Sequence, residues 1–189
     1  MGPSADLEIE RKFLVAALPG DLAPERADLI EQGYLAVAPD GAEVRLRRRG
    51  GRRFLTAKSG GGLVRREAEV ELAEEPFAAL WPLTEGRRIV KRRWRLTASG
   101  HTCELDVFEG PLAGLALAEV EFASVAASRR FTPPPWFGAE VTHDPLLAQL
   151  RYRLRRAHGA PRTRRMGVSC VFSREAVAPP GDREASAGR

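Results

Sequence analysis

Cysteine, histidine and aromatic residues are all scarce in this chain of 189 residues. The two cysteines, Cys103 and Cys170, lie far apart and the three histidines are scattered, so neither a disulfide framework nor a zinc site is expected. Aromatic residues make up only 7% of the chain. We expect the three tryptophans, Trp81, Trp94 and Trp136, to serve in packing and not to stack on nucleic-acid bases.

The chain also has no apolar run near the roughly 20 residues that a membrane-spanning helix needs. Acidic residues appear by Asp6, unlike the basic and then apolar start of a signal peptide. We therefore expect a cytoplasmic protein that does not enter a membrane. The length fits one domain, residues 1–158, followed by a tail, residues 159–189. The tail has few large apolar side chains, so we expect it to be disordered.

A net charge of +5 and an isoelectric point near 9.8 raise the question of nucleic-acid binding. Residues 159–189 carry +3 of this charge, and residues 1–158 carry +2 from 24 basic and 22 acidic residues. Any role of charge in the body therefore depends on its arrangement and not on its sum. We interpret the Arg-rich segment 151–165 as a solvated helix face and the start of the tail, so a nucleic-acid partner is not expected.

Residues 7–15 alternate between apolar and charged side chains, with Glu8, Glu10 and Lys12 at every second position. This is the period of a β-strand that has one apolar face and one charged face. Two carboxylates on that face lie about 7 Å apart, because a strand rises about 3.3 Å per residue. Such a pair suits a hard divalent cation. From this stretch alone, a solvated strand face remains the simpler interpretation.

Much of the chain as far as residue 122 repeats this alternation, with turns that contain Gly or Pro between the alternating stretches. We predict strands over residues 34–37, 43–49, 53–58, 63–72, 88–96, 102–108 and 117–122. We predict helices over residues 22–32, 74–83 and 124–131, and a final helix that begins at Asp144. Pro24 would lie in the first turn of the first helix and Gly33 just beyond its end. Residues 132–138 are expected to form a fixed loop.

The charged faces of these strands are sorted by sign. Acids alone occur at Glu8 and Glu10, at Glu67, Glu69 and Glu71, at Glu104 and Asp106, and at Glu119 and Glu121; bases alone occur at Arg45, Arg47 and Arg49 and at Lys91, Arg93 and Arg95, with Lys58 nearby. Like charges two residues apart on a strand repel each other, and cross-strand salt bridges offset this only in part. The pattern leaves two arrangements open, a solvated sheet with salt bridges and a barrel whose lumen is charged.

In a charged lumen, the acidic strands would hold divalent metal and the basic strands would hold a polyanion that bridges to it. Phosphate is the natural candidate, because Arg binds phosphate in a bidentate manner. Mg²⁺ is in turn usually shared between carboxylates and phosphates.

A series of short motifs accompanies the strands in order. They are Glu8-Ile9-Glu10-Arg11-Lys12, Gln32-Gly33-Tyr34-Leu35, Val44-Arg45-Leu46-Arg47, Thr56-Ala57-Lys58, Arg66-Glu67-Ala68-Glu69, Glu85-Gly86-Arg87-Arg88, Lys91-Arg92-Arg93, Glu104-Leu105-Asp106-Val107-Phe108, Glu119-Val120-Glu121-Phe122 and Pro133-Pro134-Pro135-Trp136-Phe137-Gly138. With these motifs, residues 7–158 resemble the CYTH superfamily, the triphosphate tunnel metalloenzymes, and within it the small bacterial inorganic triphosphatase-like branch.

The resemblance implies a mainly β fold, an eight-stranded antiparallel barrel with a charged tunnel and helices packed outside. It implies a metal-dependent triphosphatase that uses Mg²⁺ or Mn²⁺ and acts on inorganic triphosphate or another triphosphate-bearing small molecule. The metal-binding acids would be Glu8, Glu10, Glu69, Asp106, Glu119 and Glu121. The phosphate-binding residues would be Arg45, Arg47, Lys58, Lys91 and Arg93, and the catalytic pair would be Lys12 and Tyr34. Glu67, Glu71, Arg49, Arg95 and Glu104 fit the alternation as further members.

Other activities fit the same tunnel. A class IV-type adenylyl cyclase would act on ATP, although the sequence contains no recognisable base-reading pocket. Hydrolysis of nucleoside or thiamine triphosphates is a second alternative. A module that binds polyphosphate without turnover is a third, from a different functional class. The sequence does not indicate an oligomeric state.

Overall fold

The computed structural model describes residues 6–20 and 22–144. The strands are β1 (Asp6–Val15), β2 (Asp28–Val37), β3 (Glu43–Arg49), β4 (Arg52–Lys58), β5 (Val64–Glu71), β6 (Arg88–Ala98), β7 (His101–Phe108), β8 (Ala116–Glu121) and β9 (Phe137–Glu140). The α-helices are α1 (Glu74–Leu80) and α2 (Val125–Arg130), and the 3₁₀ helices are η1 (Pro24–Arg26), η2 (Trp81–Thr84) and η3 (Gly110–Leu112). No helix in this part of the chain is long and apolar enough to cross a membrane.

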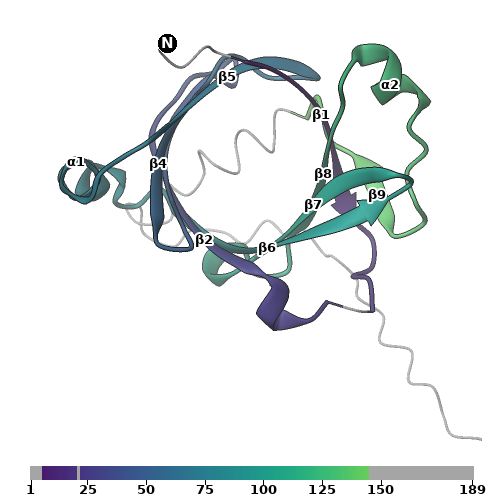
Figure 1. Ribbon diagram of the computed structural model, residues 1–189, viewed down its shortest axis with the longest axis horizontal. Coiled ribbons are helices and arrows are strands. Elements are labelled where there is room, and N and C mark those ends of the chain that lie inside the picture. The colour runs from purple at the N-terminus through teal and green to yellow at the C-terminus, as the bar shows by residue number, and fades with distance from the viewer. Residues whose placement is uncertain (1–5, 21, 145–189) are drawn as a thin grey trace, which may run out of the picture.

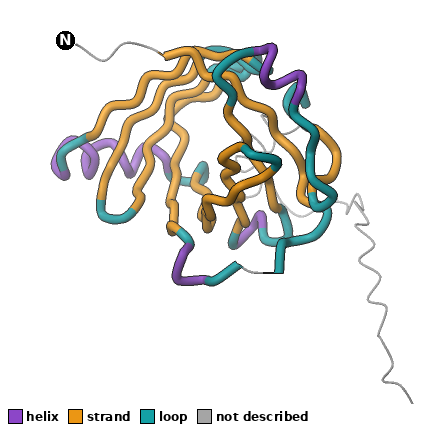
Figure 2. Tube along the Cα trace, turned by 45° about the vertical axis from the view of Figure 1, so that its right-hand side comes forward, coloured by secondary structure: helices purple, strands orange, loops and turns teal. Residues whose placement is uncertain are grey.

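Strands β1 to β8 form a closed antiparallel barrel. Their order is β5-β4-β3-β2-β6-β7-β8-β1, and pairing between β5 and β1 closes the ring, while β9 adds to β1. Figure 1 looks into this ring, with α1 and α2 on its outside. The predicted eight-stranded barrel with external helices is therefore confirmed. Tube colouring in Figure 2 shows how far strands predominate over helices.

Strand β1 has three neighbours and changes partner along its length. Its first part, Asp6 to Ile9, pairs with β5, and Glu10 to Leu14 pairs with β8. Its last part, from Phe13 to Val15, also pairs with β9. The strand that carries Glu8, Glu10 and Lys12 is thus held on both sides, and it closes the barrel.

Two apolar clusters support the barrel. One cluster lies outside, where Phe13 of β1 contacts the rings of Phe131 and Phe137 after α2. The other cluster includes Tyr34, Ile89, Phe108, Leu117 and Val141, and the first four of these also border the lumen. The tryptophans pack as predicted: Trp94 is buried, Trp81 stacks on Phe77 and Trp136 contacts Phe137.

The predicted helix over residues 22–32 is wrong. Only η1 forms there, and β2 begins at Asp28. Ile30 and Gln32 are buried at every second position, and β2 forms backbone ladders with both β3 and β6. Ladder pairing on both sides satisfies the backbone polar groups that a helix would otherwise have paired internally. Tertiary pairing therefore overrides the local helix signals.

The end of the predicted fixed loop is also corrected, because β9 begins at Phe137. The predicted final helix and tail lie outside the described residues.

Candidate active site

The barrel encloses a polar cavity of about 750 Å³. Side chains alternate between the lumen and the outside along each strand, which places the sign-sorted faces inward. All of the predicted site residues line this cavity: Glu8, Glu10, Lys12, Tyr34, Arg45, Arg47, Lys58, Glu69, Lys91, Arg93, Asp106, Glu119 and Glu121. The choice between a solvated sheet and a charged lumen is settled in favour of the lumen.

Three carboxylates from adjacent strands β1 and β8 gather at one place in the cavity. Oxygen atoms of Glu8, Glu10 and Glu121 lie within 4.8 Å of one another. Burial, and then repulsion from Glu104, Glu8 and Glu10, raises the pKa of Glu121. Glu8 Oε2 is buried and accepts no hydrogen bond from the described residues. Carboxylates that repel one another, together with an open acceptor, fit a divalent cation, which prefers carboxylate oxygens.

The two β1 acids are also held by cations. Lys58 Nζ lies 2.6 Å from Glu8 Oε1, and Arg65 Nη2 lies 3.1 Å from Glu8 Oε2, in an orientation that makes no hydrogen bond. Arg65 also donates a hydrogen bond to Glu10. Lys12 Nζ lies 2.6 Å from Glu10 Oε1 and 2.6 Å from Glu119 Oε1, so it bridges β1 and β8.

A second charged group joins β6, β7 and β8. Arg93 donates two hydrogen bonds of 2.6 Å to the two oxygens of Asp106, and its Nη2 lies 3.0 Å from Glu119 Oε2. It also pairs with Glu104. Burial opposes the charge of Arg93, but Asp106, Glu119 and Glu104 outweigh it and raise its pKa well above the ordinary value. Burial likewise opposes ionisation of Glu119, yet Lys12, Arg93 and Lys91 hold its pKa well below the ordinary value.

Lys91 differs from the other basic residues of this group. It is buried and donates a hydrogen bond to Asp106. Burial, and then the nearby positive charge of Arg93, lowers the pKa of Lys91 to about 8. Close to that pH, Lys91 can exist either as a cation or as a neutral amine.

The β3 and β4 side of the lumen is predominantly basic. Arg47 Nη2 lies 2.5 Å from Glu69 Oε2, which also accepts a 2.8 Å hydrogen bond from Thr56. Arg45 Nη1 lies 2.9 Å from the buried Glu43. Burial, followed by repulsion from Arg45, lowers the pKa of Arg47.

Two polar residues of the site, Arg65 and Gln32, were not predicted from the sequence. Arg65 follows the same alternation as Glu67 and Glu69, so the strand period could have identified it. Gln32, which donates a hydrogen bond to the Tyr34 hydroxyl, lay inside the wrongly predicted helix. Of the further members that fit the alternation, Glu67, Arg49, Arg95 and Glu104 line the cavity. Glu71 does not, because it pairs with Arg52 at an exposed position.

No family model matches the chain. The inorganic triphosphatase of Nitrosomonas europaea is 51% identical over 139 residues, which are 72% of this chain and 90% of that protein. The inorganic triphosphatase of Acetivibrio thermocellus is 37% identical over 142 residues, 73% of this chain and 87% of that protein. A crystal structure of an inorganic triphosphatase matches with a TM-score of 0.53 and 48% identity, over 72% of this chain and 87% of that one.

These relatives align with nearly their whole length, so the similarity extends over the complete barrel and is not confined to one motif. Since the barrel closes and its lumen carries the sign-sorted charges, sequence and structure agree. The chain belongs to the CYTH superfamily, the triphosphate tunnel metalloenzymes, with inorganic triphosphatases as its relatives.

Proposed function

We propose that this protein is an enzyme that hydrolyses inorganic triphosphate to pyrophosphate and phosphate inside the tunnel. The observation that carries the proposal is the enclosure of two opposed charge sets in one cavity. Arg45, Arg47 and Lys58 face the lumen from β3 and β4, and the acids of β1, β7 and β8 face the lumen from the other side. The names of the two relatives support triphosphate as the substrate.

The basic residues bind the phosphate chain. Guanidinium groups form paired hydrogen bonds with phosphate oxygens, and the enclosed lumen strengthens each of these contacts. Arg45, Arg47, Lys58, Lys91 and Arg93 take this role. Most of the catalysis then comes from positioning and charge stabilisation, as is usual for phosphoryl transfer.

Glu8, Glu10 and Glu121 are the residues that would hold a divalent cation, Mg²⁺ or Mn²⁺. We retain Glu69, Asp106 and Glu119 as further candidate ligands, because they face the same cavity. Such an ion supplies Lewis acidity and charge neutralisation when it is bound.

Two lysines are candidates for handling the reacting groups. Lys12, between Glu10 and Glu119, would orient the attacking water or the terminal phosphoryl group. Tyr34 also lines the lumen, but it lies on β2, which three strands separate from β1 in either direction around the barrel. A lowered pKa favours proton transfer by a lysine, and burial and Arg93 lower the pKa of Lys91 to about 8. We propose orientation as the role of Lys12, and phosphate binding with proton transfer as the roles of Lys91.

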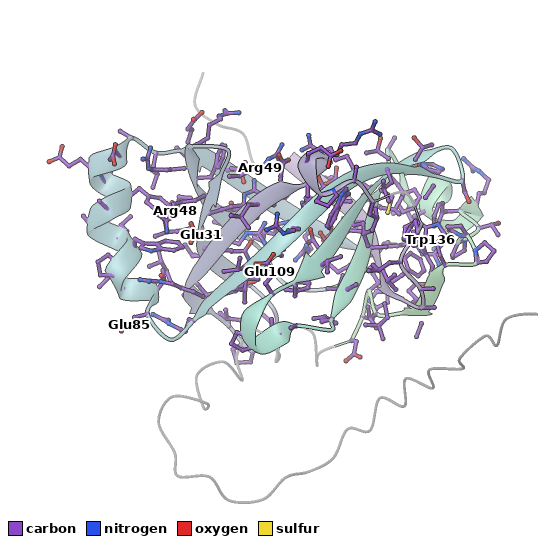
Figure 3. The ribbon with its side chains drawn as sticks, turned by 90° about the horizontal axis from the view of Figure 1, so that it is seen from below. Glu31, Arg48, Arg49, Glu85, Glu109 and Trp136 are labelled. Carbon is purple, nitrogen blue, oxygen red and sulfur yellow. The ribbon has the colours of Figure 1, made fainter. Side chains whose placement is uncertain are left out.

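Paired variants test the proposal. We expect Glu8→Gln and Lys12→Met to remain folded and to lose phosphate release from inorganic triphosphate. Glu31→Gln is the matched control, since Glu31 pairs with Arg48 on the outer face, where the two lie side by side in Figure 3. Unchanged phosphate release by both lumen variants would overturn the assignment. Release of cyclic AMP from ATP, or tight polyphosphate binding without turnover, would support the alternative activities. A cytoplasmic location remains part of the proposal.

A further inference from the structure

The backbone of Lys12 lies where β1 exchanges one neighbouring strand for another. Pairing with β5 ends beside Ile9, and the next contact on that edge is the 3.1 Å hydrogen bond from Glu10 N–H to the Leu63 carbonyl. Pairing with β9 begins only at Phe13. On this edge, the amide of Lys12 falls between two ladders.

The segment after β9 supplies the missing partners. The Lys12 N–H donates a 3.0 Å hydrogen bond to Thr142 Oγ1, and the Val141 N–H donates a 2.8 Å hydrogen bond to the Lys12 carbonyl. Thr142 is only 7% exposed. A side-chain hydroxyl therefore takes the place of a strand carbonyl at the residue that carries the site lysine.

The Thr142 hydroxyl is itself oriented by charged neighbours. It donates a 2.7 Å hydrogen bond to Glu140 Oε1, which leaves its oxygen lone pairs directed at the Lys12 amide. Arg11 holds Glu140 with two hydrogen bonds, of 2.9 Å from Nε and 2.6 Å from Nη2. Arg11 also donates hydrogen bonds to the carbonyls of Ser128 and Phe131 at the end of α2.

These contacts reach the backbone of Lys12 in the barrel wall, whereas its side chain lines the lumen. The Lys12 ammonium lies 2.6 Å from a carboxylate oxygen on each of Glu10 and Glu119. A rotation of the Lys12 backbone would move that group along the lumen. We propose that Thr142, oriented by Glu140 and Arg11, is a positioning residue that sets the Lys12 ammonium for the reaction. The inference rests on the proposed function.

Thr142→Val and Thr142→Ser in the full chain separate positioning from bulk stability. Valine keeps the shape of threonine but removes the hydroxyl group, whereas serine keeps the hydroxyl group. Displacing a catalytic group by about 1 Å can lower the rate roughly a hundredfold. We expect a smaller displacement of the Lys12 ammonium in Thr142→Val, which would lower kcat for inorganic triphosphate about tenfold. The KM should stay within about twofold, because the phosphate-binding residues lie on other strands. Thr142→Ser should restore kcat, and Thr102→Val, at an exposed threonine of β7, should leave it unchanged.

A second measurement does not depend on turnover. Amide hydrogen exchange at Lys12 should be faster in Thr142→Val than in the wild type and should return to the wild-type rate in Thr142→Ser. An unchanged kcat in Thr142→Val, or a loss that serine does not restore, would overturn the positioning role. If the wild type releases no phosphate, the proposed function fails. Independently of turnover, an amide exchange rate at Lys12 that is the same in Thr142→Val as in the wild type would overturn the inference.

Discussion

Arg93 holds Asp106 by a bidentate pair of hydrogen bonds, from Nε to Oδ1 and from Nη2 to Oδ2, each of 2.6 Å. The side chains of Arg93 and Asp106 are 7% and 1% exposed. Lys91 donates to the same carboxylate. Asp106 therefore holds two buried bases in place inside the lumen and favours their charged forms, and its loss would leave both with less compensating charge.

We predict that Asp106→Asn destabilises the protein by about 3–5 kcal/mol, the usual cost of removing one partner of a buried ion pair. Urea denaturation measures this change. The control is Glu109→Gln at the residue labelled in Figure 3. Glu109 pairs with Arg92, and both side chains are more than 40% exposed. Its effect should be about 0–1 kcal/mol. Equal effects of the two substitutions would contradict the prediction.

Gly33 tests how closely η2 packs on β2. A Cβ added to Gly33 would lie 2.5 Å from Thr84 Cβ, too close for either side chain to adjust. We predict that Gly33→Ala destabilises the protein by about 1–3 kcal/mol, as overpacking usually does. Gly20→Ala is the control, because nothing lies within 4 Å of an added Cβ there. Thermal melting measures the stability of both variants. Adding Thr84→Gly should restore stability to Gly33→Ala but not raise that of Gly20→Ala.

The strand alternation predicted most of the barrel and of the lumen. The period of two that places Glu8, Glu10 and Lys12 on one face also places Lys91 and Arg93 on the corresponding face of β6. It failed at β2, where Pro24 and Gly33 resemble the start and end of a helix while long-range pairing with β3 and β6 determines the strand. A local sequence pattern does not predict pairing between strands that are distant in the chain.

The ionisation state of Lys91 and the change of strand partner along β1 could not be predicted from the sequence either. The lowered pKa of Lys91 depends on how deeply the closed barrel buries it and on its distance from Arg93. The contact between Thr142 and Lys12 joins residues 130 positions apart. Both properties depend on how the ring closes, which the alternation of a single strand does not specify.

Glu140 gives the structure a dependence on pH that is separate from the lumen. Its hydrogen bonds from Arg11 lower the pKa of Glu140 below the ordinary value of 4.5. A carboxyl with a lowered folded-state pKa stabilises the fold above pH 4.5, and this stabilisation is lost as the pH falls through the lowered value. We predict that the wild type loses its advantage over Glu140→Gln as the pH falls below about 4.5. Denaturation curves at pH 7 and pH 3 measure this, and a constant difference between the two proteins would contradict it.

Arg65 allows a test of the metal site that does not rely on turnover. Its guanidinium pairs with Glu8 and Glu10 and repels a cation bound to them. We predict that Arg65→Met binds Mn²⁺ roughly tenfold more tightly than the wild type, because one nearby positive charge is removed. Titration calorimetry measures the affinity, with Arg66→Met as the control, since the Arg66 side chain is exposed. Unchanged or weaker Mn²⁺ binding by Arg65→Met would exclude this role.

The most direct test of the account is product analysis with the wild-type protein. Inorganic triphosphate, ATP and thiamine triphosphate are supplied separately with Mg²⁺ or Mn²⁺, and phosphate, pyrophosphate and cyclic AMP are quantified with and without a chelator. The account predicts equal amounts of phosphate and pyrophosphate from inorganic triphosphate, much slower turnover of the two esters, and no turnover with chelator. Turnover of ATP or thiamine triphosphate that exceeds that of inorganic triphosphate, or no metal-dependent phosphate release at all, would contradict it.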